Sequence, residues 1–170
     1  YVNRQTVIIN LVPLASASVS PTILARVGND LTGASIRVSG AVSVQALGET
    51  EATANAPAPV VVGGAALGAT RAAALANPDI DACIGADSTV DAGSIVLESL
   101  LNYRSDGAIV QGTYRWGSGL GTAAKGAHAR SNAATGGLVG ANSATTTATA
   151  SADVQAHINA GATIVSAGDV

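Results

Sequence analysis

Residues 79–96 read DIDACIGADSTVDAGSIV, and two related segments accompany this stretch: TILARVGNDLTGASIRVSGAV at 22–42 and DVQAHINAGATIVSAGDV at 153–170. Each segment begins with apolar residues at alternate positions: Ile, Ala and Ile in the middle copy, Ile, Ala and Val in the first, and Val, Ala and Ile in the third. The positions between them vary. An alternation with period two is typical of a β-strand that buries one face, so the three segments predict equivalent strands.

The spacing of the copies predicts how these strands assemble. Val27 and Ile84 lie 57 positions apart, and Ile84 and Ile158 lie 74 positions apart. Repeats of this length bury their apolar rows against neighbouring repeats. We therefore expect an all-β fold, a β-solenoid (parallel β-helix) built from three copies of a 57–74-residue repeat. An antiparallel β-sandwich is the alternative, because the same alternation would serve it.

The repeats predict a single domain that spans residues 1–170, with copies centred on residues 22–44, 79–98 and 153–170. Each strand-like segment is followed by a short stretch rich in Gly, Asn and Asp. These residues accept the left-handed backbone of a tight corner. We therefore expect sharp turns at equivalent places in the three copies.

Segments rich in alanine and threonine separate the copies, at residues 50–58, 68–76 and 144–152. The last of them contains the run ATTTATASA, and β-branched threonine favours strands. Alanine favours helices, so a short helix over residues 68–76 is an alternative to a strand there.

The composition limits both the core and the classes of function. Hydrophobic residues make up 48% of the chain, but there is no Phe and no Met, so the core must be thin and built of small or β-branched side chains. Charged residues make up only 11%, with a net charge of -3. This balance argues against nucleic-acid binding, which needs clustered Lys and Arg, and against disorder. No segment is apolar enough to cross a membrane as a helix.

The repeat pattern, in which Ala-x-Ile-Gly is followed by a Gly/Asp turn, a Val and a Gly-containing end, resembles a known family. It is similar to the tandem repeats of long bacterial surface exoproteins, the adhesin-like chains of the filamentous-haemagglutinin type. Residues 79–98 and 153–170 carry the likeness, and the segment GGLVGANSATTTATA continues it. The resemblance implies secretion, a β-solenoid fold and a structural or adhesive role. The regular Asn ladders of many such solenoids are absent from this sequence.

The sequence predicts no catalytic residue, no cofactor-binding residue and no metal ligand. Asp79 and Asp81 share one strand face, as Asp87 and Asp91 do, but a solvated surface explains both pairs. His157 and His128 read as surface residues. A Cys/His nucleophile pair is not expected, because the single cysteine, Cys83, and the two histidines occur in separate contexts. Cys83 can form no disulfide within the chain, and a disulfide between chains is an alternative. The Gly-rich segment GSGLGT lacks a following Lys and reads as a turn.

An insertion near residues 99–121 interrupts the repeat, because the second spacing exceeds the first by 17 residues (74 against 57). Aromatic and Arg residues gather there, and these residue types are enriched at the centres of interfaces. We expect a contact for a partner chain or a glycan, with a local cap over a strand edge as the alternative. The candidate contact residues are Tyr103, Arg104, Tyr114, Arg115 and Trp116.

The sequence stops within the third copy, and joining its last residue to the first would restore the Val-x-Val alternation. This match suggests a segment of a longer array or subunits joined head to tail. The segment VIINLVPL at 7–14 could be a strand donated to a neighbour. Exposed strand edges invite such pairing. The candidate end-to-end contact residues are Tyr1, Val2, Val7, Ile8, Ile9 and Val170.

These observations predict a structural, self-associating extracellular or cell-surface protein, a filament subunit or a fibre segment of a giant adhesin, and not an enzyme. Its expected partners are copies of itself arranged head to tail, and possible further ligands are a glycan or a host surface. Two alternatives stay open. One is a β-helix enzyme that acts on polysaccharide through Asp79 or Asp81. The other is an ice- or surface-binding solenoid that uses the Thr run at 145–149.

Overall fold

The computed structural model describes residues 10–11, 14–29, 31–58, 61–116 and 119–168. In these residues the fold is all-β, with 69% of residues in strands and no helix. The prediction of the fold class is confirmed at this level. The alternative of a helix over 68–76 is wrong, because this segment lies inside the long strand β7 (Val61–Ala76).

The described chain divides into two compact units, each made of three separate segments. Unit 1 contains residues up to Val19 together with Glu51–Ala76 and Ala127–Ala150, and unit 2 contains Ser20–Thr50, Asn77–Gly126 and Ser151–Val170. The chain therefore passes alternately through the two units.

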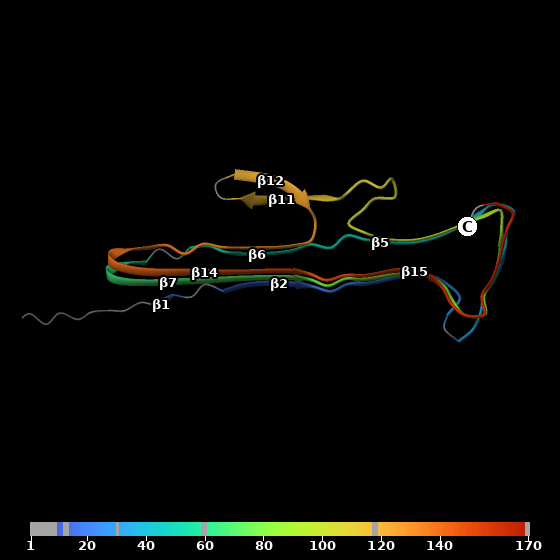
Figure 1. Ribbon diagram of the computed structural model, residues 1–170, viewed down its shortest axis with the longest axis horizontal. Coiled ribbons are helices and arrows are strands. Elements are labelled where there is room, and N and C mark those ends of the chain that lie inside the picture. The colour runs from blue at the N-terminus through green and yellow to red at the C-terminus, as the bar shows by residue number, and fades with distance from the viewer. Residues whose placement is uncertain (1–9, 12–13, 30, 59–60, 117–118, 169–170) are drawn as a thin grey trace, which may run out of the picture. The chain divides into compact units, whose positions relative to one another are not determined.

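Unit 1 consists of parallel strands (Figure 1). β7 lies in the middle of its sheet, with β14 on one side and β1 and β2 on the other. A second sheet pairs β6 with β13. Apart from β7, the strands are β1 (Asn10–Leu11), β2 (Leu14–Val19), β6 (Ala52–Ala56), β13 (Ala127–Ser131) and β14 (Thr135–Ala150).

The core of unit 1 is made of alanine. Small side chains from β6 and β7 are buried together, and alanines of β2 and β13 pack against them. The six buried alanines are each at most 3% exposed. Alternate residues of these strands point inward, as the period-two pattern predicts. The buried residues are Ala52, Ala54, Ala56, Ala72, Ala74 and Ala76.

Unit 2 contains the strands of the three aligned segments. Two three-stranded parallel sheets have the orders β15-β8-β3 and β16-β9-β4, and β10 pairs with β5 in parallel. A hairpin of β11 and β12 is antiparallel (Figure 1). The strands are β3 (Thr22–Val27), β4 (Ser35–Arg37), β5 (Ala41–Gly48), β8 (Asp79–Ile84), β9 (Thr89–Ala92), β10 (Ser94–Leu101), β11 (Gln111–Trp116), β12 (Gly119–Ala124), β15 (Asp153–Ile158) and β16 (Thr163–Ser166).

The strand register reproduces the alignment of the three copies. Ile80 lies beside Ile23 on one side and beside Val154 on the other, and Val90 lies in the same way between Ile36 and Ile164. Equivalent residues of the repeat are therefore direct neighbours in space. The parallel pairing rules out the antiparallel sandwich for these strands.

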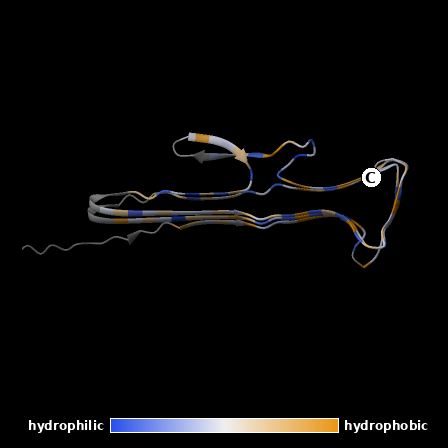
Figure 2. Ribbon diagram, in the orientation of Figure 1, coloured by the Kyte–Doolittle hydropathy of each residue, from blue (hydrophilic) through white to orange (hydrophobic). Residues whose placement is uncertain are grey.

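The corners between the strands also agree with the prediction. Asp87 and Gly161 occupy equivalent turn positions, and both have a left-handed backbone, with φ of 56° and 78°. The core of unit 2 is formed by larger side chains, among which Ile80, Ile84 and Val90 are fully buried. Figure 2 shows hydrophobic and hydrophilic residues alternating along these strands.

One detail of the repeat alignment is wrong. The sequence spacing aligns Val42 with Val96, but Val42 pairs with Ile95. Ile95 is 4% exposed and Val96 is 45% exposed, so a shift by one residue exchanges the two faces of the strand. The first copy contains one residue more than the second between β4 and β5, and this residue moves the register.

Candidate functional site

The outer strands of the parallel sheets present edges that could pair with further strands. In unit 2, β8 is paired on both sides, whereas β3 and β15 are each paired on one side only within the described residues. β4 and β16 flank β9 in the same way. Backbone N–H and C=O groups at such an edge can bind another strand.

The burial of equivalent residues shows that the stack is incompletely covered. In the middle strand, Ile80 and Ile84 are 0% exposed. Their partners in β15, Val154 and Ile158, are 41% and 46% exposed. The side chains are of the same type and occupy the same position in the strand, so the difference arises because β15 has a neighbouring strand on one side only among the described residues.

Unit 1 shows the same contrast. Along β7, alternate residues from Gly68 to Ala76 are buried, whereas their register partners in β14, from Asn142 to Ala150, are exposed. β14 is thus an outer strand with an exposed face as well as an edge. The predicted end-to-end residues Tyr1, Val2, Val7, Ile8, Ile9 and Val170 lie outside the described residues.

The insertion is longer than the sequence comparison indicated. Partners are 53 residues apart in the β5–β10 pair and 75 residues apart in the β6–β13 pair, which places 22 extra residues between β10 and β13. This segment contains the β11–β12 hairpin. The predicted range of about 99–121 begins inside β10 and ends inside β12.

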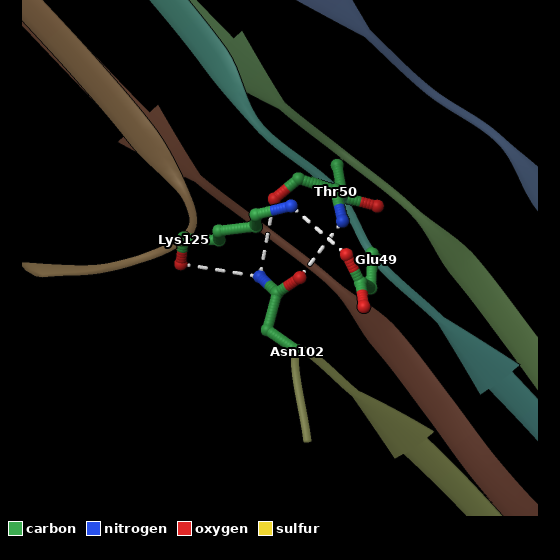
Figure 3. Close-up of polar contacts among 4 residues, drawn as sticks. All are labelled: Glu49, Thr50, Asn102 and Lys125. Atoms are coloured by element: carbon green, nitrogen blue, oxygen red, sulfur yellow. Dashed lines mark hydrogen bonds and ion pairs between the residues drawn. The ribbon is translucent and has the colours of Figure 1, made fainter. Parts of the chain in front are cut away.

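Asn102 anchors the start of the insertion (Figure 3). Its side-chain oxygen accepts a hydrogen bond from the Thr50 N–H at 2.7 Å, and its Nδ2 donates to the carbonyl oxygens of Thr50 and Lys125, both at 3.1 Å. Its backbone φ is 56°, a left-handed conformation that Asn tolerates better than most residues. Asn102 is 9% exposed. One side chain therefore connects both ends of the insertion to the chain at residue 50.

An ion pair lies beside this anchor. Lys125 Nζ donates to Glu49 Oε2 at 2.9 Å. This hydrogen bond, the charge of Lys125 and the charge of Arg104 lower the pKa of Glu49 below its ordinary value of 4.5. The Glu49 side chain is exposed to solvent, so the contribution of the pair to stability is small.

The structure describes the side chains of three of the five contact residues predicted in the insertion, and these three differ in their surroundings. Tyr103 and Arg104 line a hollow of about 380 Å³ together with Leu47, Glu49 and Ser105, among others. Tyr103 is 44% exposed. Tyr114, in contrast, is 5% exposed, with its ring over Gly112, so it is a packing residue of the hairpin rather than a contact surface. The side chains of Arg115 and Trp116 lie outside the described residues.

Two of the four acidic residues singled out in the sequence, Asp81 and Asp91, have basic neighbours. Asp91 accepts a hydrogen bond from Arg37 Nε at 2.7 Å. Asp81 Oδ1 lies 3.1 Å from His157 Nδ1. The register also places His157 directly beside Cys83. Sequence reasoning treated the cysteine and the histidine as unrelated, although the repeat alignment assigned both to one position. In a stack of parallel strands, residues at aligned positions of the repeat are neighbours in space. The shared repeat position of Cys83 and His157 could therefore have predicted that the two side chains meet.

Among the residues that the structure describes, no helix has the length and hydrophobicity required to cross a membrane. Comparison of the chain with protein-family models, with curated proteins and with solved structures gave no match.

Proposed function

We propose that this chain is a structural, self-associating protein in which three copies of the repeat form the stacked coils of a β-solenoid. In this proposal the outer strands of one copy of the chain pair in parallel with the outer strands of the next. The protein is then a filament subunit, or a segment of a longer fibre with the same stacking, at the cell surface or outside the cell.

The observation that carries the proposal is the contrast in burial between equivalent residues. Ile84 is 0% exposed between two neighbouring strands, whereas Ile158 is 46% exposed with one neighbour. A strand resembling β3 placed against β15 would give Ile158 the environment that Ile84 has. The side chains already match, because β3 presents Ile, Ala and Val where β8 presents Ile, Ala and Ile.

The energetics favour such a contact when several rows act together. Full burial of a Val or Ile contributes about 1.5–3 kcal/mol, so covering side chains that are less than half exposed contributes about 1 kcal/mol each. Edge hydrogen bonds add to this. Association costs about 4–15 kcal/mol, so one row is insufficient, and joint pairing of the long strand β14 and of β15 and β16 is required.

The symmetry of this contact leads to a filament. The edge of β15 differs from the edge of β3, so the contact joins two different surfaces and leaves both available at the ends of each assembly. Heterologous contacts that do not close produce open polymers. The resemblance to surface exoproteins of the filamentous-haemagglutinin type supports an extracellular, adhesive setting for such a fibre.

Assembly can be tested with the purified chain and a variant of the outer strand. We expect sedimentation velocity and negative-stain electron microscopy to show elongated assemblies that grow with protein concentration. The double variant Val154→Lys/Ile158→Lys places two charges on the exposed row and should remain monomeric with an unchanged circular-dichroism spectrum.

Leu31→Lys is the matched control, because Leu31 is 93% exposed outside the strands and its replacement should leave assembly intact. A wild-type chain that stays monomeric across the concentration range contradicts the proposal. So does a double variant that is folded and still assembles.

The hollow beside Tyr103 supports a second, smaller proposal of a glycan contact. A half-exposed aromatic ring next to Arg104 and Glu49 offers both stacking and charged hydrogen-bonding groups. Glycan-array binding that is lost in Tyr103→Ala would support it, and binding unchanged by that substitution would refute it. The ice-binding alternative is not favoured, because Thr145, Thr147 and Thr149 lie beside Arg71, Ala73 and Leu75 rather than beside further threonines.

A further inference from the structure

Three side chains with metal-binding atoms converge on one face of unit 2. Asp81 and Cys83 lie two residues apart on β8 and therefore share a face. β15 runs parallel to β8, and its register places His157 beside Cys83 and Gln155 beside Asp81. The Gln155 side chain donates a hydrogen bond to Asp153 at 2.8 Å. The side chain of β15 that contacts Asp81 is therefore His157.

The donor atoms of the cluster lie within reach of a single ion. The carboxylate, thiol and imidazole donor atoms all lie within 4.8 Å of one another. His157 Nδ1 and Asp81 Oδ1 are 3.1 Å apart. Both atoms are shielded from solvent, and neither has a hydrogen-bond partner among the described residues despite their proximity. Two desolvated atoms without hydrogen bonds are costly, and a cation bound to both would satisfy them.

The donor set matches zinc better than other common ions. Zn²⁺ binds His nitrogen, Cys sulfur and carboxylate oxygen in a tetrahedron. With Zn–N and Zn–O bonds of about 2.0–2.1 Å, two ligands of a tetrahedral site lie about 3.3 Å apart, close to the 3.1 Å that separates Nδ1 and Oδ1. A thiolate is a poor ligand for Mg²⁺ and Ca²⁺, which prefer oxygen.

We propose that Asp81, Cys83 and His157 form a binding site for Zn²⁺ or a similar divalent transition metal, which joins β15 to β8. The carboxylate and the thiolate together neutralise the charge of the ion. Three protein ligands leave one position for water. The side chains of Asp81 and His157 are 28% and 38% exposed, which provides a route for the ion.

The alternative use of these residues is nucleophilic catalysis by the thiol, with His157 as base and Asp81 as its partner. A nucleophile must reach its substrate, and Cys83 is only 4% exposed. A metal site has no such requirement. The site also lies within one chain, so it does not depend on the proposed self-association.

Arg26 provides an internal check on this assignment. It lies beside Cys83 on β3, on the side opposite His157. Its positive charge opposes the binding of a cation nearby. Replacing it with Gln should therefore tighten metal binding, whereas replacing any of the three ligands should weaken it.

The test uses the full chain, stripped of metal with a chelator and titrated with Co²⁺, which reports both geometry and thiolate ligation by absorption. The wild type should show the visible bands of tetrahedral Co²⁺ and a near-ultraviolet thiolate-to-metal band, and Zn²⁺ should displace the Co²⁺. Cys83→Ser should abolish the thiolate band. His157→Gln and Asp81→Asn should weaken binding by more than the 10–100-fold that loss of an outer-shell partner causes.

Two substitutions serve as matched controls: His128→Gln changes the other histidine, and Asp79→Asn changes the neighbouring acid on the same strand face. Both should bind Co²⁺ as the wild type does. Thermal unfolding adds a readout that does not depend on the thiolate absorption band: Zn²⁺ should raise the Tm of the wild type and of both controls, but not of His157→Gln. The proposal is overturned if the folded wild type gives no thiolate band at saturating Co²⁺, or if His128→Gln weakens binding as much as His157→Gln.

Discussion

The two units of this protein use the same parallel strand pairing but contrasting cores. In unit 1 most of the buried residues of β6 and β7 are alanines, whereas in unit 2 the buried positions of β8, β9 and β10 include Ile80, Ile84, Val90 and Ile95. Apart from the antiparallel β11–β12 hairpin of unit 2, the paired strands of both units are parallel. Side-chain size sets how closely facing strands can approach. The contrast shows that parallel strand pairing can accommodate cores of small and of large side chains.

The contrast also predicts how each unit responds to mutation. A core of large side chains loses stability when a side chain is shortened, since a cavity remains. Shortening an alanine removes only one methyl group, so a core of alanine loses little stability in this way. Replacing a buried alanine with a larger residue should destabilise such a core instead, because the larger side chain overpacks it. The following predictions test this difference, beginning with the largest expected effect.

Shortening a buried side chain in unit 2 should have the largest effect. Ile84→Ala should lower the free energy of unfolding by about 2–5 kcal/mol, because Ile84 is 0% exposed and a cavity would remain. Ile158→Ala removes the same atoms from the neighbouring position in β15, which is 46% exposed, and should cost less than half as much. Urea denaturation at concentrations below assembly measures both values, and equal losses would contradict the role assigned to the middle strand.

The anchor of the insertion, also in unit 2, should come next. Asn102→Gly keeps the left-handed backbone but leaves the buried polar groups of Thr50 without partners, at a cost of about 1–3 kcal/mol. Asn102→Ala adds about 1 kcal/mol or more for the backbone conformation. Denaturation monitored by circular dichroism gives both numbers. If the Gly variant proved as stable as the wild type, the hydrogen bonds of Asn102 would not be what holds the insertion.

Enlarging an alanine tests unit 1. Ala74 is 3% exposed, and Ala74→Leu should destabilise the protein by about 1–3 kcal/mol through overpacking. Ala148, its register partner on β14, is exposed, so Ala148→Leu should have little effect. Thermal unfolding of the two variants provides the comparison. An unchanged Tm in Ala74→Leu would contradict this prediction, because it would show that the core of unit 1 can accommodate a larger side chain.

The smallest effect concerns the ion pair of Glu49 and Lys125. Because the folded protein holds the pKa of Glu49 below its ordinary value of 4.5, the pair contributes stability that is fully present above that pH and is lost as the pH falls through the lowered pKa. NMR titration should place the Glu49 pKa below 4.5 in the wild type and closer to it in Lys125→Gln. The same midpoint in both proteins would mean that Lys125 does not cause the shift.

Much of the fold was predictable because the repeat encodes strand neighbours directly. The residues aligned with Ile80, which are Ile23 and Val154, are its partners on either side. The alignment failed between β4 and β5, where a single extra residue moved Val42 from Val96 to Ile95. Counting residues cannot locate such a shift, because the choice between adjacent positions depends on which side chain finds space in the core.

The candidate sites were less predictable. The sequence indicated an insertion with aromatic residues, but not that Tyr114 packs inside its hairpin while Tyr103 lines a hollow. Asn102 gave no signal in the sequence, because its role depends on partners 52 and 23 residues away. The alignment of the copies already placed Cys83 and His157 at one repeat position. Predicting their cluster with Asp81 also required that equivalent positions lie side by side in space, which holds only when the strands pair in parallel and in register.

By itself, the sequence determined that the chain forms strands, which face of each strand is buried, and which strands are equivalent. These properties follow from local alternation and from repetition, which act over a few residues at a time. Only the tertiary structure decided the parallel pairing, the exact register after each turn and the exposure of the outer strands. These depend on contacts between residues 50 or more positions apart, whose energies a local pattern does not contain.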